Sequence, residues 1–426
     1  MKLSKTNIDR SGLALAKDQW RSEDEYFELE EVFDEYRKSH LLPLTELTLE
    51  LQQWLTGFES PYYIAQRLKR KPQIVRKLNR FSVRLTQLQD IGGCRIIVEN
   101  NNQVDALLAY LNKRLSEQKN IAVTRETDYR VKGRDDTGYR AIHLLISLGG
   151  RSLELQIRSR VQHYWAESIE RTSVIYGYHL KEGEGDPSVI QYFKRLSDIF
   201  YEIEANREPS PAQKIELDKL RAVSEETIAQ SDKNKVFESF VNEDIIKQLS
   251  AIESGKRAGF NNWIIVFDWN TGSFVSWDLV DRDPDTAIKA YVRHEEMFPV
   301  HEGFEVVMIG SSDVATVSQT HSHYFGIEKY DKILESLPEA VIGFSKRQDI
   351  DAGARQILNK LHSRDAWGKR KSIARNTLQN HFCKNVFTFD YSLGVLIEKE
   401  LVISNSGKGG AVSLNIVKKA EVEAHL

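Results

Sequence analysis

The sequence has little cysteine and no long apolar run. Its two cysteines, Cys94 and Cys383, lie far apart and lack the spacing of metal ligands. This usage excludes a disulfide framework and is typical of a reducing, cytoplasmic compartment. The first ten residues lack the apolar core of a signal peptide, and the apolar stretch Trp263–Phe267 has the length of a strand, not of a membrane span. We therefore expect a cytoplasmic protein with no membrane partner.

Several chemical signatures are also absent. The net charge of −3 excludes a global attraction to nucleic acid, although basic residues can still cluster locally. The chain has neither a P-loop nor the Gly-rich loop and Asp-Phe-Gly set of protein kinases. It has no internal repeat and no low-complexity tract. With 426 residues, of which 41% are hydrophobic, it is long enough for two or three domains with real cores.

Helical and strand patterns divide the chain into four parts. Residues 1–206 are predicted to form an α+β domain, in which a mixed sheet follows a polar lead-in and two helices between Glu23 and Phe58. A Glu-Pro-Ser-Pro run then opens a helical linker at 207–234. A small α+β regulatory domain is expected at 235–335, with a hairpin that turns at Asn270–Ser273.

The last part, 340–426, is basic early in its sequence and predicts three helices followed by two short strands around a Gly-rich tip. That order is typical of a winged helix, which would contact nucleic acid. A protein-binding or packing module is the alternative.

Four histidines, His294, His301, His321 and His323, lie near one another in the preceding part, but their spacing matches no zinc pattern.

The most informative stretch is Arg151–Glu167. Its first half alternates strictly, so that Glu154, Gln156 and Arg158 share one face of a strand, about 7 Å apart. In such a row, the carboxylate is able to bind a metal ion, the amide is able to form hydrogen bonds with the polar edge of a ligand, and the guanidinium is able to bind a phosphate. An ordinary amphipathic strand is the alternative.

Three further stretches contribute candidate site residues. The strand at Tyr62–Lys69 and the following helix carry a dense set of cations, namely Arg67, Lys69, Lys77 and Arg80. Asp90 precedes a Gly pair at the start of a strand that contains Arg95. A Gly-rich loop leads to Tyr139, which offers a flat aromatic face, and to His143, for which a buried structural role is the alternative. Two carboxylates among many cations are the inventory that a magnesium-assisted reaction on polyphosphates requires.

Four motifs in this order resemble the RelA/SpoT-type alarmone synthetases. They are Arg-Leu-Lys followed by Lys-Leu-Asn-Arg, Gln-Asp-Ile-Gly-Gly-Cys-Arg-Ile-Ile, Thr-Gly-Tyr-Arg-Ala-Ile-His, and Leu-Glu-Leu-Gln-Ile-Arg-Ser with Gln-His-Tyr-Trp-Ala-Glu. They cover roughly residues 25–205. The resemblance implies a nucleotidyltransferase-like synthetase fold that transfers pyrophosphate from ATP to the 3′-hydroxyl of GDP or GTP, yielding (p)ppGpp and AMP.

The resemblance also implies a role for each candidate residue. Asp90 and Glu154 would hold Mg²⁺, and Glu154 would also activate the hydroxyl. Arg67 and Arg95 would sandwich the adenine of ATP, and Lys69, Lys77 and Arg80 would hold its phosphates. Tyr139 would stack on the acceptor base, with His143, Gln156 and Arg158 nearby.

Two departures from the family pattern bear on the activity. Asp135 and Asp136 occupy a loop that is cation-rich in the family, so they would repel an acceptor diphosphate, although Lys132 and Arg134 are able to substitute. A toxin-type enzyme that modifies tRNA 3′ ends or adenine nucleotides, restrained by its C-terminal domains, is therefore an alternative, and an inactive nucleic-acid-binding regulator is another. No His-Asp pair occurs anywhere, so the hydrolase motif of the bifunctional members is absent and we expect synthesis alone. The sequence does not determine whether the protein is a monomer or a homo-oligomer.

Overall fold

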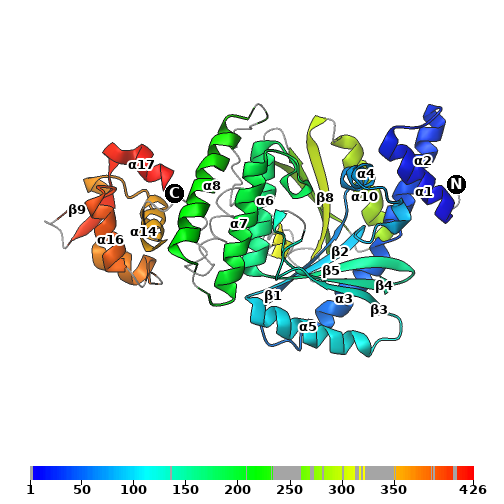
Figure 1. Ribbon diagram of the computed structural model, residues 1–426, viewed down its shortest axis with the longest axis horizontal. Helices are drawn as coiled ribbons and strands as arrows, with labels where there is room; N and C mark the ends of the chain where they lie inside the picture. The colour runs from blue at the N-terminus through cyan, green and yellow to red at the C-terminus, as the bar shows by residue number, and fades with distance from the viewer. Residues whose placement is uncertain are drawn as a thin grey trace. The chain divides into compact units, whose positions relative to one another are not determined.

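In the computed structural model, the described residues form a mixed eight-stranded sheet at the centre of the larger of two compact units (Figure 1). The strand order is β3-β4-β5-β2-β1-β8-β6-β7. β2 pairs with β5 in parallel, whereas the other neighbouring pairs are antiparallel. The strands are β1 Tyr62–Leu68, β2 Gly92–Val98, β3 Ala122–Asp128, β4 Ile142–Leu148, β5 Arg151–Ser159, β6 Asn261–Asp268, β7 Ser273–Val280 and β8 Phe304–Ser311.

The structure describes residues 3–134, 137–207, 209–231, 233, 261–268, 273–280, 283–299, 302–311, 316–317, 320–321, 350, 352–384, 386, 389–405 and 410–426. Several predictions fall outside these residues, namely Asp135 and Asp136, the turn of the predicted hairpin, His301 and His323, the basic pair Lys346 and Arg347, and most of the Gly-rich tip near the C-terminus.

Several helices begin at short polar side chains that cap them. Ser22, Asn100 and Ser159 each accept a hydrogen bond from a backbone N–H of the first turn, as N-cap residues do. Ser159 ends β5 and starts α6 in a reciprocal capping box with Gln162, so the strand that carries Glu154 turns directly into a helix. The helices that accompany the sheet are α1 Lys5–Lys17, α2 Glu23–Lys38, α3 Leu41–Leu55, α4 Lys71–Arg80, α5 Asn101–Ser116, α6 Arg160–Tyr176, α7 Pro187–Glu204 and α10 Pro284–Met297, with short 3₁₀ turns η1 at Leu85–Gln87 and η3 at Leu180–Glu182. A further helix, α8 Pro211–Ala229, contains residues of both compact units.

The lead-in that the sequence predicted as merely polar is in fact the helix α1. Ser4 caps it, and its apolar stripe, including Ile8 and Leu15, is buried. The edge strand β3 was not predicted either, because its side chains are mostly exposed and polar, as is common at sheet edges, and so give no apolar alternation.

Helices cover both faces of the sheet. Figure 1 shows α3 and α5 on one face and α6 and α7 on the other. On the first face, apolar residues of α3, α5 and the alternate positions of β1, β2, β4 and β5 form one core, which includes Leu47, Leu107, Ile96, Leu144 and Leu155. The intervening positions of the same strands therefore point to the opposite face, where the candidate site lies.

The domain expected at 235–335 is not separate, because its strands continue the sheet formed by β1 to β5. β8 pairs with β1 through Gln66↔Gly310 and Arg67↔Ile309, and β6 and β7 follow in order. Residues 1–207 and 219–333 accordingly form one compact unit. The apolar pattern predicted β6, β7, β8 and α10, including its Asp283 cap, but it could not show that the free edge of β1 is their pairing partner.

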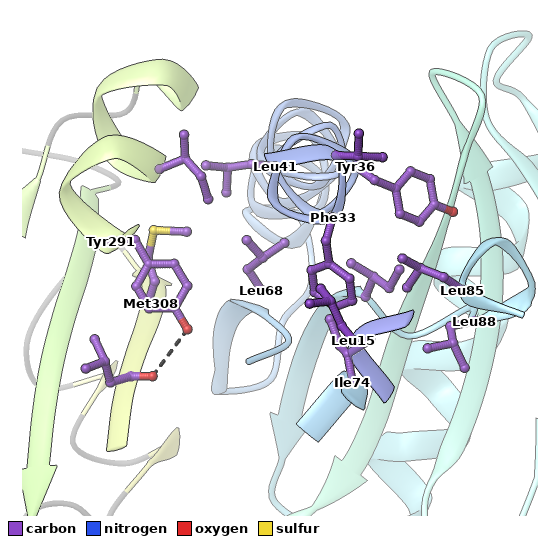
Figure 2. Packing of buried hydrophobic residues seen from close by; sticks show 14 of the residues in the cluster. Leu15, Phe33, Tyr36, Leu41, Leu68, Ile74, Leu85, Leu88, Tyr291 and Met308 are labelled. Atoms are coloured by element: carbon purple, nitrogen blue, oxygen red, sulfur yellow. Dashed lines mark hydrogen bonds between the residues drawn. The ribbon is translucent and has the colours of Figure 1, made fainter. Parts of the chain in front are cut away.

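A single apolar cluster joins the N-terminal helices to β6, β7, α10 and β8, which are called the extension from here on (Figure 2). Phe33 and Leu15 pack with Leu68 and Ile74 of the β1–α4 region, and Tyr291 and Met308 of the extension belong to the same cluster. The Tyr291 hydroxyl donates a hydrogen bond of 3.2 Å to the Val306 carbonyl. The extension is therefore part of the core that holds α4 beside the sheet.

The second compact unit contains residues 208–218 and 334–426. Its helices are α14 Ala352–His362, α15 Arg375–Thr377 continuing as η7 Leu378–Phe382, α16 Phe389–Glu398 and α17 Lys419–Ala424, with short turns η6 Lys369–Lys371 and η8 Ile416–Lys418 and an antiparallel pair β9 Val402–Asn405 and β10 Ala411–Leu414. Leu358, Leu396 and Leu414 lie in its core. None of the helices in the described part of the chain combines the length and apolar character that a membrane crossing requires.

Candidate active site

A cleft of about 470 Å³ lies over the sheet face of β1, β2, β4 and β5. The register places its residues in two rows. Arg67, Gly93 and Glu154 are side by side in the first row, and Arg95, Gln156 and His143 are side by side in the next. Gly93 contributes no side chain, so it leaves a gap between Arg67 and Glu154 in the floor of the cleft.

Every residue predicted for the site lines this one cleft. The set comprises Arg67, Lys69, Lys77, Arg80, Asp90, Arg95, Tyr139, His143, Glu154, Gln156 and Arg158. Because eight of the lining side chains are lysine or arginine and four are carboxylates, the cleft has the excess positive charge that a polyphosphate requires.

Asp90 lies between two lysines at the start of β2. Its Oδ2 accepts hydrogen bonds from Lys69 Nζ at 2.6 Å and from Lys77 Nζ at 2.8 Å. Burial alone would raise the pKa of Asp90, but the two ammonium groups outweigh it and hold that pKa well below its usual range. Asp90 is therefore a carboxylate at neutral pH, and the two lysines are held at one place in the cleft.

Glu154 is the centre of a second hydrogen-bond network. Its Oε1 lies 2.9 Å from His143 Nδ1, and its Oε2 accepts a hydrogen bond of 2.6 Å from Gln156. Burial raises the pKa of Glu154, but the bond and charge of His143 bring it down to about 2, while the nearby Asp90 charge opposes that drop. Asp90 and Glu154 line the same cleft.

His143 links Glu154 to Tyr139. The other ring nitrogen, Nε2, lies 2.7 Å from the Tyr139 hydroxyl. Burial lowers the pKa of His143, but Tyr139 and Glu154 together raise it to about 9. The sequence could not distinguish this arrangement from an ordinary buried histidine, because the contact with Glu154 depends on the pairing of β4 with β5.

Arg158 holds Tyr139 on the other side. Its Nη2 donates to the Tyr139 hydroxyl and to Gln156 Oε1, both at 2.7 Å, and its guanidinium lies 4.8 Å from the centre of the Tyr139 ring. Among the described residues, Nε and Nη1 of this buried arginine have no hydrogen-bond partner. Those two groups are donors with unmet capacity inside the cleft.

Arg67 and Arg95 lie on adjacent strands, offset by two residues in register. That offset corresponds to about 7 Å along the strands. Arg67 Nη2 donates to Gln73 Oε1 at 3.0 Å, and Arg95 Nη1 donates to the Thr320 carbonyl at 3.0 Å. Burial, together with the neighbouring Arg158 charge, lowers the pKa of Arg95 to about 10, so it stays cationic at neutral pH.

Asp90 and Glu154 line the same cleft, and carboxylate oxygens are the ligands that a hard divalent cation prefers. Asp90 Oδ1 is buried and has no hydrogen-bond partner among the described residues, so one oxygen of the pair is available. No cluster of three or more histidine, cysteine, aspartate or glutamate side chains suited to a metal occurs in the described part of the chain. Mg²⁺ suits such a site because it commonly binds one or two carboxylates and completes its shell with water and substrate phosphates.

Other lining residues were not identified from the sequence. Lys181 and Glu170 form an ion pair of 2.9 Å, Glu182 accepts from Arg80 through its carbonyl at 2.8 Å, and His321 reaches the cleft from beyond β8. A run of charge at Lys181–Glu182 was the signal for the first of these. No signal in the sequence placed His321 in the cleft, because its position depends on the pairing of β8 with β1.

A model of the region found in RelA and SpoT proteins matches residues 66–181. Uncharacterised proteins from Mycobacterium bovis and Mycobacterium tuberculosis are 26% identical over 144 residues, which is 33% of this chain and 50% of theirs. The chain thus spans about half the length of the curated relatives it matches.

Two solved structures of bacterial proteins are among those to which the chain is similar. Small alarmone synthetase 1 from Bacillus subtilis, bound to its product pppGpp, is 24% identical, with 39% of this chain and 92% of that chain covered and a TM-score of 0.33. The protein smu.1046c from Streptococcus mutans UA159 is also 24% identical, with coverages of 45% and 98% and a TM-score of 0.33. The predicted resemblance is confirmed for the matched region: residues 66–181, which include every residue predicted for the site, match the region found in RelA and SpoT proteins.

Proposed function

We propose that this protein is a pyrophosphokinase that transfers the β,γ-pyrophosphate of ATP to the 3′-hydroxyl of GDP or GTP. The observation that carries this proposal is the placement of Asp90 and Glu154 in one cleft lined by eight cationic side chains. Such a cleft holds a polyphosphate by charge, while a carboxylate beside it is able to accept a hydroxyl proton.

The donor side of the cleft would take ATP. Arg67 and Arg95 would hold the adenine between their guanidinium planes, which stack well on flat rings. Lys69, Lys77 and Arg80 would bind the phosphates. Because Lys69 and Lys77 already converge on Asp90, a phosphate that binds there would meet two ammonium groups held in advance by the protein.

Mg²⁺ would be held by Asp90 and Glu154. When bound there, it would neutralise charge that develops on the transferred group. The buried, unpartnered Asp90 Oδ1 supports this assignment.

The acceptor side would use the residues around Tyr139. Its ring would stack on the acceptor base, with His143, Gln156 and Arg158 beside it. The 3′-oxygen of the acceptor then attacks the β-phosphorus of ATP, the bond from that phosphorus to the α–β bridging oxygen breaks, and AMP leaves. Glu154 is ionised at neutral pH and would accept the hydroxyl proton. With no His-Asp pair in the sequence, we propose synthesis without hydrolysis.

The test is product identification with the full chain, Mg²⁺ and labelled ATP, offered GDP, GTP, adenine nucleotides and tRNA in parallel. Label on GDP or GTP is the expected result. Transfer to tRNA or adenine nucleotides would overturn the guanine acceptor and support the toxin-type alternative, which the aspartates at 135 and 136 favour. No transfer to any acceptor would overturn the enzymatic proposal itself.

Two variants and one control sharpen that test. We expect Glu154→Gln and Asp90→Asn each to reduce transfer by at least about a hundredfold, which is the scale of a lost general base or electrostatic group. Glu99→Gln is the matched control, because Glu99 follows the same strand β2 but is exposed and pairs only with Arg160 among the described residues. Equal losses in the control and in the two variants would contradict the assigned roles.

A further inference from the structure

A second cavity, of about 220 Å³, lies between α4 and the extension. One wall comes from α4 and the residue before it, through Arg70, Pro72 and Arg76, and the opposite wall comes from the end of α10 and the start of β8, through Phe298 and Phe304. Gln73 is the one described residue that lines both this cavity and the catalytic cleft. The cavity therefore exists because the extension packs on the synthetase region.

The apolar part of the cavity suits a flat ring. Phe298 and Phe304 pack edge to face with ring centres 5.4 Å apart, and Pro72 and Val306 complete the apolar lining. Aromatic rings prefer such edge-to-face or offset neighbours. The volume is below the ~300–1,000 Å³ usual for drug-sized ligands, so it suits a ligand with a single ring.

The charged part of the cavity favours an anion. Both acidic residues in the lining already have cationic partners, since Glu305 pairs with Arg70 and Glu295 receives two hydrogen bonds from the buried Arg37. Arg76 is different. Glu182 Oε2 lies 3.5 Å from its Nε, and that buried Nε has no hydrogen-bond partner among the described residues.

We propose that this cavity binds a single-ring aromatic carboxylate, with the ring between Pro72 and the two phenylalanines and the carboxylate on Arg76. A planar guanidinium donates two parallel hydrogen bonds to a carboxylate, and the weak contact with Glu182 does not provide this arrangement. The ligand is thus defined by a ring, one negative charge and small size.

Binding at this cavity would reach the catalytic cleft through α4, and this step rests on the proposed use of the cleft for ATP. Glu182 also faces Arg80, at 3.9 Å from its Nη1, and Gln73 accepts a hydrogen bond from Arg67. A carboxylate that takes Arg76 releases Glu182 to pair with Arg80. Since Arg80 is assigned to the ATP phosphates, the occupied cavity weakens ATP binding.

The experiment uses isothermal titration calorimetry on the full chain with benzoate, and with neutral benzamide as the matched ligand. We expect saturable benzoate binding, at least tenfold weaker binding of benzamide, and at least tenfold weaker benzoate binding to Arg76→Gln. Arg293→Gln is the control, because Arg293 is exposed on α10 and does not line the cavity. Thermal melting of each variant shows that it is folded.

A second titration measures ATP with and without saturating benzoate, and we expect a threefold to tenfold weaker ATP affinity with it. No benzoate binding at millimolar concentration, or equal binding by Arg76→Gln and the wild-type chain, would overturn the site. Unchanged ATP affinity at saturating benzoate would overturn the coupling. If benzoate binds but ATP does not, the proposed function fails while the site stands, so the two failures are distinguishable.

Discussion

The contact between Arg37 of α2 and Glu295 of α10 offers a stringent test of the fold, because it ties the N-terminal helices to the extension. Arg37 is 1% exposed. Its Nη1 and Nη2 donate to the two Glu295 oxygens at 2.9 and 3.0 Å, its Nε donates to the Lys69 carbonyl at 3.0 Å, and its guanidinium lies 4.6 Å from the Tyr291 ring centre. We consider the change Arg37→Met, which keeps the apolar stem and removes every one of these contacts.

The expected loss of unfolding free energy follows from the groups that Arg37→Met leaves without a partner. Removing one partner of a buried ion pair typically costs about 3–5 kcal/mol, because the other charge stays buried and unpaired. Glu295 retains 19% exposure and is able to turn toward water, so we expect the lower end, about 3 kcal/mol. The Lys69 carbonyl also loses its donor, which keeps the cost from falling much below that value.

The matched control is Lys38→Met on the same helix. Lys38 pairs with Asp285 of α10 at 2.7 Å, so it joins the same two helices, but its partner is 65% exposed. Exposed ion pairs contribute about 0–1 kcal/mol. A difference of about 2 kcal/mol between the two variants therefore isolates burial as the cause.

Urea unfolding of the full chain, followed by far-UV circular dichroism, measures both variants. The relevant transition is that of the unit formed by residues 1–207 and 219–333. The double variant Arg37→Met with Glu295→Gln should recover part of the lost unfolding free energy, since it also removes the unpaired Glu295 charge. A cost for Arg37→Met no greater than that for Lys38→Met would refute the reasoning, and so would a transition in which the extension unfolds alone.

Three further predictions concern other parts of the molecule. Burial, with the nearby Arg151 charge, lowers the pKa of His40 to about 4. The unfolded chain then binds the proton more readily, so unfolding free energy is unaffected above pH 6.5 and falls by up to about 3 kcal/mol as the pH drops toward 4. His40→Gln should flatten that part of a pH series of urea melts, and an unchanged slope would contradict the assignment. Arg140 donates to the Val131 carbonyl, Ser197 and Asp198, and so positions the loop that carries Tyr139. Steady-state kinetics of Arg140→Met should show at least a tenfold higher KM for the acceptor with the KM for ATP within twofold, and a rise in both would point to general unfolding instead. In the C-terminal unit, Lys369, Arg370 and Lys371 are exposed, and we expect salt-sensitive binding of duplex DNA that falls at least fivefold when all three become glutamate, as measured by fluorescence anisotropy. Absence of binding at low salt would leave this unit as a protein-binding or packing module.

Much of the site could be predicted because its chemistry is local in sequence. Glu154, Gln156 and Arg158 occupy alternate positions of one strand, and a strand places alternate residues on one face whatever its neighbours are. Asp90 and its Gly pair precede a buried strand, and the cations before them lie on a strand and helix with clear apolar faces. The four motifs then showed in which order the strands and the helix of the site follow one another along the chain.

The remainder depended on contacts between distant segments. His143 touches Glu154 because β4 pairs with β5 in one particular register, and a shift by one residue would turn it to the other face. His321 and the cavity behind α4 depend on a strand that begins at Phe304 and pairs with one that ends at Leu68. Apolar alternation gives such a strand its faces but says nothing about its partner.

The sequence by itself determined most of the strands, the Asp283 helix cap and the residue types of the site, because periodicity and capping act over a few neighbouring residues. Only the tertiary structure decided that the extension shares the synthetase sheet and core. The physical reason is that unpaired backbone groups along the edge of β1 accept any strand of suitable length and apolar face, and the choice among candidates is made by packing of the whole unit, such as Tyr291 and Met308 against Phe33.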